Sequence, residues 1–106
     1  MPLLDLRPAL ATAVNGAATM NQDAGIITTD ALITAAQASY TLTIGCQGAG
    51  SSSVVHASLA NGTNTQGIPV LALVKAGGDA IVCTIFNLHA TQALNGTLQV
   101  KFVVFK

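Results

Sequence analysis

In the ten residues 97–106, TLQVKFVVFK, every second residue from Leu98 to Val104 is apolar, and Gln99 and Lys101 alternate with them. Such alternation is typical of a β-strand that has one face in a core. The inward face would carry Leu98, Val100, Phe102 and Val104, and the outward face Gln99, Lys101, Val103 and Phe105. Because Val103 and Phe105 would lie side by side on the surface, we expect this strand to associate with another copy. A second sheet or the N-terminal segment of the same chain is the alternative cover for Phe105.

Two apolar runs precede this strand. Residues 80–88, AIVCTIFNL, and residues 67–75, GIPVLALVK, are apolar on both faces. This pattern is typical of central strands or of strands that a partner covers. The sequence AGGD at residues 76–79 separates the two runs and predicts a turn.

Three earlier segments complete the predicted fold. Alternation places Val55, Ala57 and Leu59 of residues 53–60 inward, and His56 and Ser58 outward. In residues 39–44, SYTLTI, it places Tyr40, Leu42 and Ile44 on one face, and Thr41 and Thr43 on the other. Residues 25–34 are the first candidate strand region, although TTDALITAAQAS at 28–39 is helix-like, with Asp30 as a possible cap. About six strands with regular turn signals predict an all-β fold, an antiparallel β-sandwich with a jelly-roll-like order.

Residues 1–24 lack this alternation. Pro2 and Pro8 stiffen the start, and the segment is too short and too rich in alanine to have a core of its own. We therefore expect an extended N-terminal arm at 1–24 that packs on another surface, followed by a sandwich domain at 25–106. A short helix that starts at Pro8 and stops at Asn15-Gly16 is the alternative.

The composition narrows the classes of function. Charged residues make up 8% of the chain, glutamate is absent and the net charge is zero. An isolated monomer of this kind should associate, so we expect neighbouring subunits to cover much of its surface. No run approaches the roughly 18 apolar residues of a spanning helix, and four scattered basic residues make no phosphate-binding patch. Asp5 and Arg7 interrupt the place of a signal peptide's apolar region, so we expect the protein to remain where it is made.

The candidate chemical groups are few. Cys46 and Cys83 are far apart without CxxC spacing, so we interpret them as free thiols in the core, with a disulfide as the alternative. His56 and His89 are interpreted as solvated or interface residues. The chain has no GxSxG motif, no phosphate-loop motif, no EF-hand spacing and too few ligands for zinc. We therefore predict no enzyme and no catalytic, cofactor-binding or metal-binding residue.

The tripeptide Asn-Gly-Thr occurs twice, at residues 61–63 and 95–97. It is a glycosylation sequon, a turn signal or the trace of a duplication. The sequon requires a secretory route that the N-terminus does not favour, and the flanking sequences share little. We therefore predict turns, because both Asn and Gly accept a positive φ.

The order of these features resembles that of small β-rich virion proteins of tailed bacteriophages. The resemblance covers residues 25–104 and lies in a threonine-rich opening strand, the SYTLTI strand, the loop ANGT before GIPV, and the final stretch IFNLHATQALNGTLQVKFVV at 85–104. Such proteins occur as head decoration proteins and as domains of tail or fibre proteins. The resemblance implies a virion component that is assembled in the host cytoplasm.

Of these two roles, the size of the chain favours a capsid decoration (cement) protein. We expect a homotrimer that stabilises the outer head shell through mainly apolar contacts with the major capsid protein or another virion protein. The alternative is a tail fibre or a receptor- or glycan-binding module. The absence of tryptophan and the presence of one tyrosine weaken that alternative, because glycan sites usually offer aromatic platforms. A small secreted bacterial adhesin would need the missing signal peptide.

Overall fold

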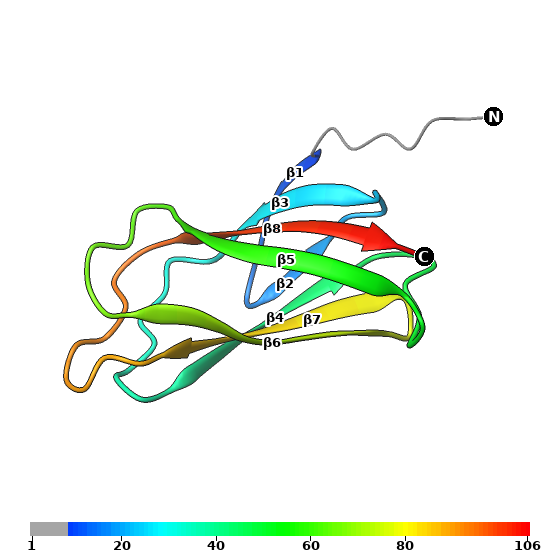
Figure 1. The fold of residues 1–106 in the computed structure, drawn as a ribbon. Helices are drawn as coiled ribbons and strands as arrows, with labels where there is room; N and C mark the ends of the chain where they lie inside the picture. The colour runs from blue at the N-terminus through cyan, green and yellow to red at the C-terminus, as the bar shows by residue number, and fades with distance from the viewer. Residues whose placement is uncertain (1–8) are drawn as a thin grey trace.

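A computed structural model describes residues 9–106, which form two β-sheets packed face to face (Figure 1). The strands of this region are β1 (Ala9–Thr12), β2 (Ala17–Thr19), β3 (Ala24–Thr28), β4 (Ser39–Gly45), β5 (Val54–Asn61), β6 (Pro69–Gly77), β7 (Ala80–Asn87) and β8 (Leu98–Phe105). Within this range the structure has no helix that is long and apolar enough to cross a membrane. The prediction of an all-β sandwich is confirmed.

Each sheet has four strands. Sheet A has the order β1-β3-β8-β5, and sheet B has the order β2-β4-β7-β6. The pairs around β8 and β7 are antiparallel, but β1 runs parallel to β3 and β2 runs parallel to β4. Both sheets are therefore mixed, so the prediction of an antiparallel sandwich is wrong for the pairs that β1 and β2 make. The jelly-roll-like order is not confirmed, because a jelly roll is antiparallel.

The chain changes sheet at every connection except the β6–β7 hairpin. That hairpin closes with the two-residue loop Gly78-Asp79, whose φ angles are 58° and 61°. Positive φ at both central positions matches the right-handed twist of the flanking strands, and Gly and Asp tolerate it. The predicted turn at residues 76–79 is confirmed.

Part of the N-terminal region belongs to the sheets. Ala9–Thr12 pair in register with Gly25–Thr28, and β2 pairs with the end of β4. The helix alternative for this segment is wrong, because β3 offers the short strand a partner for its backbone groups. Ala13 and Met20 are buried, so an extended arm is not confirmed for residues 9–24. The first part of the expected arm, residues 1–8, lies outside the described residues.

The first predicted strand region is shorter than expected. β3 ends at Thr28, and residues 29–38 form neither strand nor helix, so the helix-like pattern is also wrong. The Thr29 hydroxyl donates to the Asp30 carbonyl and accepts a hydrogen bond from the Leu98 amide. These local bonds compete with the continuation of the strand ladder.

The core lies between the two sheets and has the composition that the alternation predicts. The inward residues of β8 are all buried: Leu98, Val100, Phe102 and Val104. Leu42 and Ile44 of β4 are buried as well, and Tyr40 packs at the margin of the core. Gly25 faces inward, where an added Cβ would lie 1.9 Å from the Met20 sulfur. Glycine at this position therefore lets Met20 pack against sheet A.

The two strands that are apolar on both faces differ in position. β7 is central in sheet B, as one of the predicted alternatives states. β6 is an edge strand, and its register with β7 shifts between Leu71 and Leu73. A bulge, the proline at Pro69 and an exposed Lys75 are features that protect an edge strand from pairing with other chains. The apolar side chains on the outer face of β6 therefore belong to an edge strand and not to a central strand.

Candidate interaction surface

The outer face of sheet A exposes several large apolar side chains. The strand registers place Leu10, Ala24, Ile26, Val54, His56, Ser58, Lys101, Val103 and Phe105 on it. Leu10 is 76% exposed, Val54 54% and Phe105 46%. The outward position predicted for Val103 and Phe105 is confirmed, and so is that of His56 and Ser58. Apolar side chains from four strands thus meet solvent on one flat surface.

Phe105 lies at the C-terminal end of β8 and remains uncovered. Its ring contacts the His56 imidazole edge to face, with ring centroids 6.2 Å apart. Val54 lies directly opposite it on β5. Within the described part of the chain, neither sheet B nor the N-terminal strands cover the ring. The alternative that the chain itself buries Phe105 is therefore not confirmed for residues 9–106.

A groove of about 380 Å³ crosses the middle of this face. Its walls include Ile26, His56, Lys101 and Val103. Its floor is formed by the strands at Gly25, Ala57 and Phe102, where the side chains of Ala57 and Phe102 face inward. The groove lies between two rows of outward residues, Ala24, Val103 and His56 on one side and Ile26, Lys101 and Ser58 on the other. Ala24 and Ser58 are small, and Ala24 is buried. The groove is wide enough to receive large apolar side chains from another surface.

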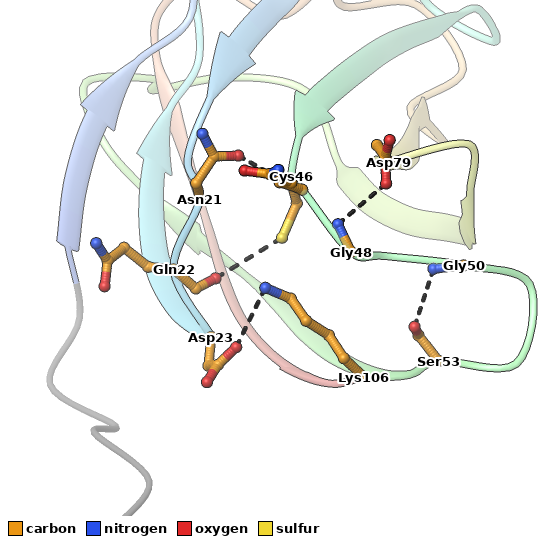
Figure 2. Close-up of polar contacts among 10 residues, drawn as sticks. Asn21, Gln22, Asp23, Cys46, Gly48, Gly50, Ser53, Asp79 and Lys106 are labelled. Carbon is orange, nitrogen blue, oxygen red and sulfur yellow. Dashed lines mark hydrogen bonds and ion pairs between the residues drawn. The ribbon is translucent and has the colours of Figure 1, made fainter.

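The described residues on this face include a positive charge but no aspartate. Lys101 is exposed on it, and the structure places none of Asp23, Asp30 and Asp79 among its outward residues. Asp23 lies at the end of the sandwich, 3.4 Å from the Lys106 ammonium, and Asp79 accepts the Gly48 amide nearby (Figure 2). The outer face therefore combines apolar side chains with a positive charge and complements a partner of the opposite sign.

The same end of the sandwich contains one of the two cysteines. The Cys46 thiol points toward the Gln22 carbonyl, 3.7 Å away (Figure 2). Cys46 and Cys83 are both buried and unpaired, as the sequence predicts, and the disulfide alternative is not supported. Burial raises the pKa of Cys83 to about 11, and it also raises the pKa of Cys46. Both thiols are therefore protonated at neutral pH and poor nucleophiles.

A second groove, of about 400 Å³, lies beside Asp30. The Asp30 carboxylate accepts hydrogen bonds from the Tyr40 hydroxyl at 2.5 Å, from the Gly16 amide at 2.9 Å and from the Asn15 amide at 2.5 Å. Asn15 and Gly16 have φ angles of 52° and 77° and form the tight turn between β1 and β2. The Tyr40 hydrogen bond and then the backbone bonds lower the pKa of Asp30, although partial burial opposes them.

The two Asn-Gly-Thr copies lie against each other. The Thr63 amide donates to the Thr97 hydroxyl at 3.0 Å, and the Thr97 amide donates to the Thr63 hydroxyl at 2.9 Å. An added Cβ on Gly62 would lie 2.4 Å from the Thr97 Oγ1, and one on Gly96 would lie 2.7 Å from the Thr63 Oγ1. We call this reciprocal arrangement the NGT clasp.

The predicted positive-φ turns at the NGT copies are wrong. The described residues with positive φ include neither Asn-Gly pair of the clasp, and the glycines serve close approach instead. The repeat of the tripeptide was the available signal. It could not be interpreted from the sequence because the hydrogen bonds join residues 34 positions apart.

Asn87 is a further residue that the sequence analysis missed. It is fully buried at the end of β7, where its Oδ1 accepts the Ile68 and His89 amides. Its Nδ2 donates to the carbonyls of Thr34, Ala35 and Gln92. The side chain thus joins the loops 29–38, 62–68 and 88–97, which lie together at one end of the sandwich (Figure 1). We call this end the loop end.

The histidines do not form a reactive site. His56 lies on the outer face of sheet A, whereas the His89 Nδ1 accepts the amides of Thr91 and Gln92 within the loop end. No three His, Cys, Asp or Glu side chains of residues 9–106 gather as a metal site requires. The chain matches no protein family, no curated protein and no solved structure in the comparisons.

Proposed function

We propose that this chain is a structural subunit of a tailed-phage virion, most specifically a capsid decoration protein that assembles as a homotrimer. The observation that carries the proposal is the outer face of sheet A, where Leu10, Val54 and Phe105 are exposed together beside a groove. Contiguous apolar surface of this kind marks a protein–protein interface. The resemblance of residues 25–104 to virion proteins supplies the identity of the assembly.

The trimer forms through the outer face of sheet A. Each copy contributes Phe105 and its neighbours Val54 and Val103, which lie on the two adjacent strands β5 and β8. Burial of one phenylalanine side chain favours association by about 1.5–3 kcal/mol. A threefold axis repeats this term, so modest contacts add up to a stable subunit.

The loop end provides a second contact surface, for the major capsid protein or another virion protein. Ile33 is 88% exposed there, Leu88 50% and Ile68 49%. Asn87 fixes the loops that carry these side chains, so the surface is ordered before binding. Preorganised loops lose less conformational entropy when a partner binds.

Mass-spectrometric counting of this protein in purified particles tests the proposal. A decoration protein is present in hundreds of copies, in proportion to the major capsid protein. A handful of copies would instead assign the chain to the tail and contradict the decoration role. Absence from purified particles would contradict the virion role altogether.

The groove beside Asp30 favours a second candidate, a receptor- or glycan-binding module of the virion. It combines the ring of Tyr40 with polar groups of Asn15, Asp30, Ser39 and Thr41. Glycan sites pair an apolar aromatic surface with such hydrogen-bonding groups. A glycan array screened with the intact protein and with Tyr40→Ala tests this candidate, which requires binding that the substitution removes.

A further inference from the structure

The groove on the outer face of sheet A has a defined chemical complement. Its walls are Ile26, Val103 and the His56 ring, and Lys101 adds a positive charge beside them. A matching occupant offers large apolar side chains and one carboxylate at short spacing.

The carboxylates of the described chain do not serve this purpose. Asp23 pairs with Lys106, Asp30 holds Tyr40 and the β1–β2 turn, and Asp79 accepts the Gly48 amide. The sequence has a fourth aspartate, Asp5, within Leu-Leu-Asp-Leu at residues 3–6. This stretch has the required composition, three large apolar side chains around one carboxylate.

We propose that residues 1–8 dock into the outer-face groove of a neighbouring copy, with Asp5 beside Lys101 and the leucines on the apolar walls. This inference rests on the self-association proposed above and names its contact. It concerns the chain itself and requires no other virion protein.

The position and length of the segment allow this contact. Residues 1–8 precede Ala9, which pairs with Gly25, one of the residues that line the groove. Eight residues can extend over at most about 26–29 Å. A segment that starts at the edge of one outer face can therefore reach a groove on an adjacent copy that lies within this distance.

Two features favour a neighbouring copy over the segment's own groove. β1 runs parallel to β3, so its N-terminal end at Ala9 points toward the Ala24 end of the sheet. A two-residue reversal with positive φ favours glycine or asparagine, and residues 1–8 contain neither. Pro8 also disfavours the helical region for Arg7 and promotes an extended backbone.

Such an exchange is directional, because one copy donates a segment and the next copy receives it. Contacts of this heterologous kind close into rings when the rotation between copies is suitable. A ring of three would use every groove and every segment once. The exchange thus pairs each groove of the proposed trimer with one segment, which a nonspecific apolar face does not do.

Disulfide trapping between copies tests the proposal directly. Full-length Asp5→Cys and full-length Lys101→Cys are mixed and mildly oxidised, and the products are identified by mass. We expect a covalent dimer that contains one copy of each variant; the native thiols are buried and do not interfere. The control pairs Asp5→Cys with Lys75→Cys, because Lys75 is exposed on sheet B. Mixed dimers no more abundant than this control would overturn the proposal.

A charge exchange provides a second, independent measurement. We expect Asp5→Lys or Lys101→Glu to weaken self-association in sedimentation by about fivefold, the upper range for an exposed ion pair. The variant that carries both changes should regain the wild-type affinity within about twofold. Lys75→Glu should leave the affinity unchanged.

The possible failures are distinguishable. If the wild type self-associates but neither single charge change affects it, the docking of residues 1–8 is wrong and the proposed oligomer stands. A double-cysteine variant that forms its disulfide only within one chain would likewise overturn docking on a neighbouring copy. A wild type that remains monomeric would contradict the self-association on which both proposals depend.

Discussion

At the scale of single residues, the polar contacts of this protein join segments that are distant in the chain. Asp30 holds the β1–β2 turn through two amides and orients Tyr40 on β4. Its carboxylate therefore connects the N-terminal strands with both sheets. Since aspartate pKa values fall when the charged form accepts several hydrogen bonds, this contact is also sensitive to pH.

We expect Asp30→Asn to lower the free energy of unfolding at pH 7 by about 1 kcal/mol, a modest value because the carboxylate is only half-buried. The pKa of Asp30 is lower in the folded protein than in the unfolded chain. The stability that the Asp30 carboxylate contributes is therefore complete above the unfolded pKa of about 3.9. It is lost as the pH falls through the lower pKa of the folded protein. Urea unfolding between pH 3 and pH 7 measures this difference.

Tyr40→Phe is the matched variant for this prediction. It removes the largest cause of the lowered pKa of Asp30 and keeps the aromatic ring. The loss of stability on acidification should then be smaller than in the wild type. If Asp30→Asn loses as much stability between pH 7 and pH 3 as the wild type, the assigned role of the carboxylate is wrong.

The NGT clasp gives a second prediction at this scale. An alanine at Gly62 would place its Cβ against the Thr97 side chain and backbone, so we expect a loss of about 1–3 kcal/mol in the free energy of unfolding. Gly50→Ala is the control, because nothing lies within 4 Å of its added Cβ and its φ is not positive. Equal midpoints of urea unfolding for the two variants would contradict the clasp.

At the scale of secondary structure, β8 tests the proposed association. We expect Phe105→Ser to shift the protein from trimer toward monomer in sedimentation, because a half-exposed ring leaves the outer face of sheet A. The β-sheet circular dichroism should not change, since Phe105 points away from the core. Leu73→Ser is the control, because Leu73 is an exposed apolar residue on sheet B. An unchanged oligomer would remove Phe105 from the interface.

The long strands were predictable because each of them carries a local signal. In β8 a period of two separates the core residues from Val103 and Phe105, and the structure follows that separation. β1 and β2 carry no such signal, because alanine fits either side of a strand and their stability comes from parallel partners far along the chain. The exposed apolar face was therefore accessible from the sequence, whereas the groove, the NGT clasp and the Asn87 network required the fold.

At the scale of the whole molecule, the low charge and the exposed apolar residues both favour contact with other protein surfaces. The outer face of sheet A and the loop end lie on different parts of the sandwich, and each exposes large apolar side chains. A molecule with two such surfaces can contact its own copies through one and a different protein through the other. Zero net charge then favours dense packing, since neighbouring subunits do not repel one another over long range.

Truncation of the N-terminus decides where the folded unit begins. Deletion of residues 1–8 leaves every described strand in place, so we expect a cooperative unfolding transition close to that of the full chain. Deletion of residues 1–24 removes β1, β2 and the buried side chains of Ala13 and Met20. It also exposes β3 and β4 as new edges and leaves the Asp30 carboxylate without its two amides.

Loss of the methionine side chain alone costs about 2–5 kcal/mol, a large part of the stability of a domain of this size. We therefore expect the longer deletion to lower the thermal midpoint by more than 10 °C or to prevent folding, as measured by circular dichroism during heating. A stable fragment 25–106 with an unchanged midpoint would instead restore the boundary at residue 24 and make β1 and β2 accessory strands. The shorter deletion is the control, because it separates the contribution of residues 1–8 to association from the contribution of residues 9–24 to the sandwich.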